Sequence, residues 1–140
     1  MKEFHLEILT PSSPFFDGDC VSLVVPTYDG MMGILAGRSP LTAAIHDGRV
    51  VFTTPDGDVR VCAVTRGMVS VSSERVRILC ESAAAPEDID EENELRALED
   101  AQIELRKRQS YEDYMLSQLA FAKAINRLKV KQYAAMHTNM

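Results

Sequence analysis

The sequence has no long apolar run and no excess of basic residues, and each absence excludes a class of protein. No stretch approaches the roughly 18 apolar residues of a membrane-spanning helix, so we expect no membrane insertion. The net charge is −6. Because contacts to nucleic acid phosphates need a basic surface, we expect no nucleic-acid partner. The first residues lack the apolar core of a secretory signal, which favours the cytoplasm.

Motifs for catalysis and for metal binding are also missing. The chain has no Gly-x-Ser-x-Gly elbow and no Gly-x-x-x-x-Gly-Lys phosphate loop. His5, His46 and His137 stand alone, without the spacing of a metal-binding pair. We therefore predict that the chain is not an enzyme and has neither catalytic residues, nor a metal, nor a cofactor.

The three cysteines, Cys20, Cys62 and Cys80, are widely spaced within apolar, strand-like runs. An odd number at such spacing does not resemble a disulfide framework or a zinc site. We interpret them as small buried hydrophobic residues in a reducing compartment.

Up to about residue 85 the pattern indicates short strands. Phe4, Leu6 and Ile8 alternate with polar residues, and Cys20–Val25 forms an apolar run that Pro26 ends. Further runs pair across short turns as two hairpins. Since no helical crossover separates the runs, we predict an antiparallel sandwich or barrel. The runs of the two hairpins are 50–54 with 59–64, and 68–72 with 76–80.

After Pro86 the chain has no glycine or proline, and helix formers dominate. Asp88 or Asp90 can cap a first helix, and Ser110 to Asp113 fit a capping box that begins a second. An apolar face of the second helix runs through Tyr114, Phe121, Ile125 and Leu128. The predicted fold is mainly β plus α. A flattened antiparallel β-sandwich over residues 1–85 precedes an antiparallel two-helix hairpin with a short tail over 86–140.

Charge predicts how the two helices lie. Residues 87–104 carry nine acidic side chains and one basic side chain, Arg96, whereas the second helix ends with several basic residues. A short connection places the acidic start beside the basic end. Two helices of this size bury too little apolar area to be stable alone. The hairpin must therefore dock on the sandwich or on a partner, and two competing docked states would make a switch.

Residues Gly30 to Leu41 carry glycines at 30, 33 and 37 and end at Pro40 and Leu41. This spacing argues against an ordinary strand or helix, and Ile34 and Leu35 are apolar enough to be buried. Met31 and Met32 are either exposed contact residues, or one of them belongs to the core.

This segment resembles the Gly-x-x-Gly-Ile-Leu-x-Gly-His-x-Pro-Leu signature of the epsilon subunit of F-type ATP synthases. Similar family patterns follow in order along nearly the whole chain. They are Leu9-Thr10-Pro11, Phe16-Asp17-Gly18-Asp19, Ile45 to Val50, Arg66 to Val71, Ile78-Leu79, Asp88-Ile89-Asp90 and Ala124 to Val130. Within Gly30 to Leu41 three positions depart from the family: Met31 replaces an acidic residue, Ala36 a proline and Arg38 the histidine. Further along, Arg66 replaces the first glycine of a Gly-Gly-Phe segment.

The resemblance implies a non-catalytic rotor subunit of the central stalk. The sandwich would bind the gamma subunit and the c-ring, coupling ion flow to rotation and ATP synthesis. The complex would hold the chain, as a peripheral protein, at the cytoplasmic face of the plasma membrane. The partner-binding residues implied are Gly30, Met31, Met32, Gly33, Gly37, Arg38, Ser39, Pro40 and Leu41.

By the same resemblance, the hairpin would contact the alpha and beta subunits when extended, and so inhibit ATP hydrolysis. The basic residues either make these contacts or form a solvated face paired with Glu91 and Glu92. They are Arg106, Lys107, Arg108, Lys123 and Arg127.

Some family members bind ATP through an Ile-Asp-x-x-Arg-Ala motif and basic residues of the second helix. Here the motif begins with Ile89 and Asp90, but Asn93 replaces its arginine and Glu94 follows. Asp90, Lys123 and Arg127 remain as weak nucleotide candidates. We predict weak or no ATP binding, because a cation is lost and an anion is gained. The alternative function is a free-standing β-sandwich adaptor whose hairpin binds another protein.

Overall fold

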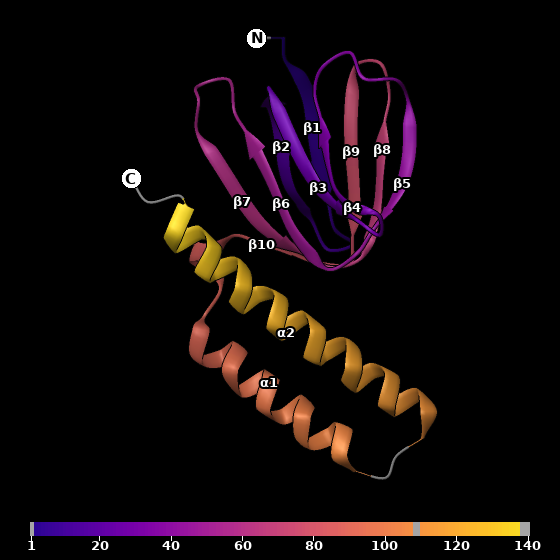
Figure 1. Ribbon diagram of the computed structural model, residues 1–140, viewed down its shortest axis with the longest axis vertical. Coiled ribbons are helices and arrows are strands. Elements are labelled where there is room, and N and C mark those ends of the chain that lie inside the picture. The colour runs from indigo at the N-terminus through magenta and orange to yellow at the C-terminus, as the bar shows by residue number, and fades with distance from the viewer. Residues whose placement is uncertain (1, 108–109, 138–140) are drawn as a thin grey trace.

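The computed structural model describes residues 2–107 and 110–137, and it consists of a β-sandwich with a two-helix hairpin against one end (Figure 1). The predicted fold class is confirmed. The elements are β1 (Phe4–Leu9), β2 (Pro14–Cys20), β3 (Ser22–Thr27), β4 (Gly30–Ile34), β5 (Leu41–Ile45), β6 (Gly48–Thr53), β7 (Val59–Val64), β8 (Gly67–Val71), β9 (Arg75–Cys80), β10 (Ala83–Ala84), the 3-10 turn η1 (Pro86–Asp88), α1 (Glu91–Arg106) and α2 (Tyr111–His137).

The strands follow the order β10-β7-β6-β3-β5-β8-β9-β1-β2, with β4 paired to β3. A single residue pair, Thr27 with Ile45, connects β3 to β5, so the sheet folds over there into two layers. The two predicted hairpins are confirmed as β6–β7 and β8–β9. One ladder differs from the antiparallel expectation, because β1 and β9 run parallel.

Strand alternation builds the core between the layers. In β1 the side chains of Phe4, Leu6 and Ile8 are buried, while the residues between them are more exposed. The same period of two appears in β9. The core is completed by Cys20, Leu23, Val25, Ile34, Ile45, Val50, Phe52, Cys62, Val64, Val69, Val71, Val76, Ile78 and Cys80.

The expected strand over Cys20–Val25 is wrong in its bounds. Cys20 ends β2, and β3 continues through Pro26 to Thr27. The carbonyl of Pro26 accepts a hydrogen bond from the backbone N–H of His46, 3.1 Å away. Because N–H and C=O of one strand residue point to the same side, the missing N–H of Pro26 faces His46, and the β3–β4 ladder loses no bond.

The helices begin where the sequence predicts. The Asp90 side chain accepts hydrogen bonds from the backbone N–H groups of Glu92 and Asn93, and Ser110 Oγ accepts one from that of Asp113. Figure 1 shows α2 lying between the sandwich and α1. The hairpin is therefore docked on the sandwich.

The predicted apolar face of α2 is only half-buried, and Tyr114 is 40% exposed. The buried positions of α2 are instead Ala124, Val130 and Ala134. Val130 and Ala134 belong to a cluster that includes strand residues of the sandwich. A second face of small residues thus meets the sandwich, and the sequence did not predict it.

Candidate partner-binding surfaces

Residues Gly30–Leu41 form a strand, a loop and the start of another strand. The expectation that the glycines exclude a regular strand is wrong for Gly30–Ile34, which is β4 and pairs with β3. Positive φ angles occur at the first residue of the strand, Gly30 (φ 117°), and in the loop after it, at Gly37 (φ 85°). Glycine thus makes the two turns and leaves the strand between them regular.

Arg38 holds the loop against β4. Its Nη1 donates a hydrogen bond to the carbonyl of Gly33 at 2.9 Å, and its backbone N–H donates to the carbonyl of Leu35 at 3.3 Å. Because β4 pairs with β3 alone among the described strands, this contact covers part of an edge strand that would otherwise be open to pairing.

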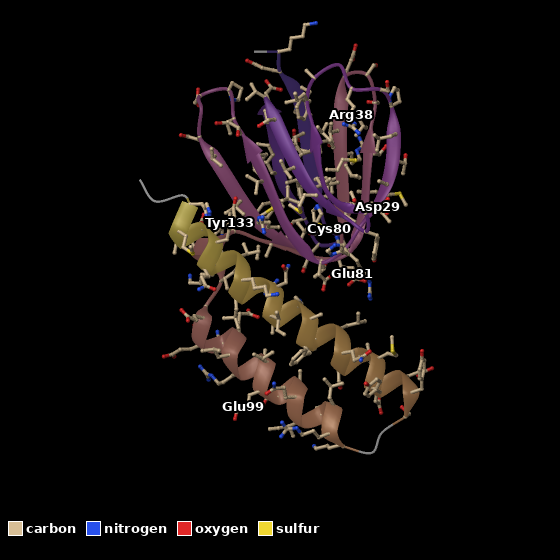
Figure 2. All side chains as sticks on the ribbon, viewed as in Figure 1. Asp29, Arg38, Cys80, Glu81, Glu99 and Tyr133 are labelled. Carbon is tan, nitrogen blue, oxygen red and sulfur yellow. The ribbon has the colours of Figure 1, made fainter. Side chains whose placement is uncertain are left out.

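Two apolar side chains of the segment face solvent. Met31 is 48% and Leu35 56% exposed, whereas Ile34 is buried and Met32 packs partly against the core. The expected burial of Leu35 is wrong, because Leu35 follows an inward-facing residue at the end of the strand. Figure 2 shows Asp29, beside the Gly30 turn, near the end of the sandwich that faces the hairpin, with Arg38 further from the hairpin.

A second apolar surface crosses four strands on the outer face of the β5–β8–β9–β1 layer. In the strand register Ala44 pairs with Met68, Met68 with Leu79, and Leu79 with Leu9. Met68 is 48% and Leu79 49% exposed. We call these four residues the apolar row.

The apolar row borders a groove of about 580 Å³ at the end of the layer. An ion pair between Arg66 and Glu81, 3.6 Å apart, lies at the groove, and Tyr28 beside it is 69% exposed. An apolar patch rimmed by polar groups is typical of a protein–protein interface. This surface was not predicted, although the outward phase of each strand is readable from its alternation. The pairing of β1 with β9, which brings the four residues together, cannot be predicted from that alternation.

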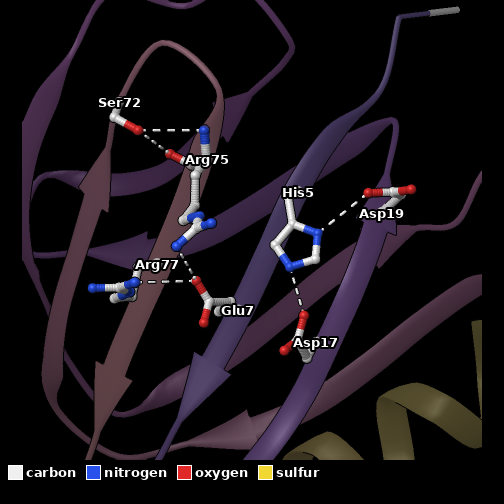
Figure 3. Close-up of polar contacts among 7 residues, drawn as sticks. All are labelled: His5, Glu7, Asp17, Asp19, Ser72, Arg75 and Arg77. Carbon is white, nitrogen blue, oxygen red and sulfur yellow. Dashed lines mark hydrogen bonds and ion pairs between the residues drawn. The ribbon is translucent and has the colours of Figure 1, made fainter.

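Charged residues cover the outer face beyond the apolar row (Figure 3). Glu7 pairs with Arg75 at 3.2 Å and with Arg77 at 3.3 Å. His5 lies between Asp19, 3.3 Å away, and Asp17, 2.5 Å away. The hydrogen bond to Asp19 is the main cause that raises the pKa of His5 above its ordinary value. The layer therefore changes from apolar at one end to charged at the other.

Most of the predicted inhibitory residues face solvent or pair within the hairpin. Arg106 is exposed, and Lys107 lies 2.9 Å from Glu104. The expected pairing of basic residues with Glu91 and Glu92 is wrong for Arg127, whose partner is Glu94. Arg108 lies outside the described residues.

The nucleotide candidates are partly occupied by the chain itself. Arg127 Nη1 lies 3.5 Å from Glu94 Oε2, and the two side chains are 23% and 14% exposed. Asp90 is engaged as the helix cap, and Lys123 is half-buried. The antiparallel helices thus bring an acidic residue of α1 to a basic residue of α2, as the charge pattern predicted.

The prediction of buried cysteines is confirmed, since Cys20, Cys62 and Cys80 are buried with free thiols. Burial raises the pKa of Cys20 to about 12 and that of Cys80 to about 11, and it also raises that of Cys62. Within residues 2–107 and 110–137, no three His, Cys, Asp or Glu side chains are grouped so as to hold a metal ion. Among the described residues no helix has the length and apolar character to span a membrane.

Comparison with protein families gives two adjoining matches. Residues 3–86 match the beta-sandwich domain of the ATP synthase delta/epsilon chain, and residues 87–132 match its long alpha-helix domain. Two curated relatives are both called ATP synthase epsilon chain. The protein of Caldanaerobacter subterraneus subsp. tengcongensis is 35% identical over 92% of this chain and 94% of the relative. That of Bacillus velezensis is 35% identical over 93% of this chain and 98% of the relative.

Solved structures share the fold. One chain of the mitochondrial ATP synthase of Euglena gracilis (OSCP, F1 and c-ring) matches with a TM-score of 0.77 and 20% identity, over 96% of this chain and 82% of that one. A chain of the central stalk and c-ring of the Tetrahymena thermophila mitochondrial enzyme matches with a TM-score of 0.60 and 12% identity, over 93% of this chain and 97% of that one.

Proposed function

Since the chain belongs to the ATP synthase delta/epsilon family, we propose that it is a non-catalytic rotor subunit that couples ion flow through the c-ring to ATP synthesis. The observation that carries this proposal is the apolar row. A subunit that transmits torque needs a binding surface on a rigid part of its fold. The apolar row meets this requirement because it lies on regular strands of one layer.

We propose that the gamma subunit covers the apolar row and the groove beside it. The Gly30–Leu41 segment supplies a second contact, shared between gamma and the c-ring, through Met31 and Leu35, whose side chains are exposed. In the assembled complex the chain is a peripheral protein at the cytoplasmic face of the plasma membrane.

The hairpin is the proposed regulatory part, and Ala85 the proposed last residue of the sandwich domain. The end of the hairpin that connects α1 to α2 carries apolar side chains in solvent, including Tyr111 (77% exposed) and Leu116 (65%). We propose that these and the basic side chains meet the alpha and beta subunits once the hairpin leaves the sandwich. That contact opposes ATP hydrolysis.

A chain that ends at Ala85 tests both halves of the proposal. The main core cluster lies entirely within residues 4–80, so the shortened chain is expected to fold and to bind the catalytic head as the full chain does. ATP hydrolysis by the purified head should fall with the full chain and stay unchanged with the shortened one. If both forms bind and neither suppresses ATP hydrolysis, the chain is a coupling subunit whose hairpin does not inhibit. If neither form binds, the rotor assignment fails and the adaptor function replaces it.

We further expect the isolated chain to bind ATP weakly or not at all, because Glu94 neutralises Arg127 at the candidate site. Calorimetric titration with Mg-ATP should show no saturable heat at micromolar concentrations. In Glu94→Ala, Arg127 loses its carboxylate partner, so a nucleotide affinity that appears only in this variant would support the explanation. Micromolar affinity in the unaltered chain would contradict it.

A further inference from the structure

The docked hairpin is held to the sandwich by a small number of polar contacts from the C-terminal half of α2. The side-chain amide of Asn126 donates to the carbonyl of Gly48 at 3.0 Å and to the carbonyl of Val64 at 3.2 Å. Gly48 and Val64 are partners in the β6–β7 ladder. Both N–H groups of one amide are therefore used to extend the end of that ladder.

Two more contacts follow along the same helix. The guanidinium of Arg49, on β6, lies 4.3 Å from the centre of the Tyr133 ring. Arg49 Nε is buried and has no hydrogen-bond partner among the described residues. Lys131 Nζ donates to the carbonyl of Pro86 at 3.1 Å, but Pro86 follows the sandwich, so this bond joins α2 to the connecting turn η1 and not to the sandwich.

The apolar part of this contact is modest. It consists of small and medium side chains, half of them alanine, so little apolar surface leaves water when α2 docks. The members are Val61, Ala63, Ala84, Ile89, Val130 and Ala134.

We propose that Asn126 and Tyr133 form a clasp that decides whether the hairpin is docked or free. When α2 leaves, water can satisfy the carbonyls of Gly48 and Val64, so release has a low cost. The clasp thus fixes the position at which α2 docks on the sandwich, and it still allows α2 to leave. The regulatory consequence rests on the proposed function, whereas the clasp itself does not.

Asn126 is the position where a single change separates this proposal from general destabilisation. Asparagine offers two donors to two carbonyl oxygens, whereas an ionised aspartate of the same shape offers none and repels both. Alanine removes the bonds without adding repulsion. The matched control is Gln132→Glu, which makes the same change from amide to carboxylate at an exposed position of the same helix.

A reporter cysteine measures how often α2 leaves the sandwich. Val130 is 2% exposed within the docked contact, so the thiol that Val130→Cys introduces reacts with a maleimide only when the hairpin is free, at a rate proportional to the free population. The native thiols are buried in the sandwich, and their labelling rate in the chain with the natural valine at position 130 is the baseline that reports unfolding of the sandwich. The two chains thus report release and unfolding separately.

With Val130→Cys as the reference, we expect Asn126→Ala to raise the labelling rate of the introduced thiol about tenfold, which equals about 1.4 kcal/mol. Asn126→Asp should raise it by about a hundredfold, and Gln132→Glu should leave it unchanged, while labelling of the native thiols stays slow in all of them. An unchanged rate in Asn126→Asp, or native thiols that react in step with the introduced one, would overturn the clasp.

The same variants then separate the clasp from the proposed function. Asn126→Asp, with the natural valine at position 130, should suppress ATP hydrolysis by the catalytic head more strongly than the unaltered chain does. Faster labelling without any change in hydrolysis would keep the clasp and reject the inhibitory hairpin.

Discussion

Leu79→Arg is expected to weaken binding of the chain to the gamma-containing catalytic head by at least about 30-fold. Leu79 stands in the middle of the apolar row, between Met68 and Leu9. If gamma covers the row, the substitution places a charge without a partner in an apolar contact and removes a branched side chain that fills it. Each effect alone costs about 2 kcal/mol at the centre of an interface. Surface-based binding measurements with the immobilised head would give the ratio of dissociation constants.

The matched control is Val59→Arg. Val59 is 52% exposed and lies on β7, away from the apolar row, so it tests the same apolar-to-basic change on another surface. Both variants should keep their thermal unfolding temperatures, because exposed positions contribute about 0.5 kcal/mol or less to stability. Equal affinities for the two variants would mean that gamma does not use the row.

Gly67→Ala is expected to destabilise the sandwich by at least about 4 kcal/mol. A Cβ atom at Gly67 would lie 1.9 Å from the carbonyl oxygen of Leu79 and 2.7 Å from the Cα atom of Cys80. Both neighbours are backbone atoms of β9, so no rotamer change relieves the clash and the β8–β9 ladder has to open. A loss of this size is a large share of the roughly 5–15 kcal/mol that holds a typical domain together.

Thermal unfolding followed by circular dichroism should show a midpoint at least about 15 °C lower for Gly67→Ala. Gly33→Ala is the control. A Cβ atom at Gly33 meets no atom within 4 Å, and its backbone has no left-handed angle. Its midpoint should move by no more than a few degrees. A small shift for Gly67→Ala would show that β8 and β9 lie further apart than the structure places them.

Local patterns in the sequence were sufficient to predict the fold class. Alternation identified β1, two strand-like runs on either side of a short turn identified the β6–β7 hairpin, and Asp90 and Ser110 marked the helix starts. Each of these signals depends on residues a few positions apart. The Cys20–Val25 strand failed for the same reason, since Pro26 is tolerated in β3 only because of a neighbour distant in the sequence, His46.

The surfaces proposed for function depend on long-range pairing. The apolar row requires β1 beside β9, and the clasp requires Asn126 beside the β6–β7 ladder. Neither alternation nor helical spacing contains that information. The exposure of Leu35 and of Met32 could not be predicted either, because it depends on where β4 ends. The Arg127–Glu94 pair could be predicted in part. The opposite charges of the two antiparallel helices indicate that an acidic residue of α1 lies near a basic residue of α2, but they do not identify which acidic residue.

The parallel pairing of β1 with β9 also constrains how the chain is made. Contacts such as Glu7 with Arg77 join residues 70 positions apart. At a synthesis rate of about 5–20 residues per second, β9 is therefore made roughly 4–14 s after β1. Until then, the inner face of β1 is an uncovered apolar strip with a free edge. The charged residues on its other face and on β2 oppose pairing of that edge with other nascent chains. The charged side chains that form ion pairs in the folded sandwich thus have an earlier role, which is to oppose aggregation of the incomplete chain.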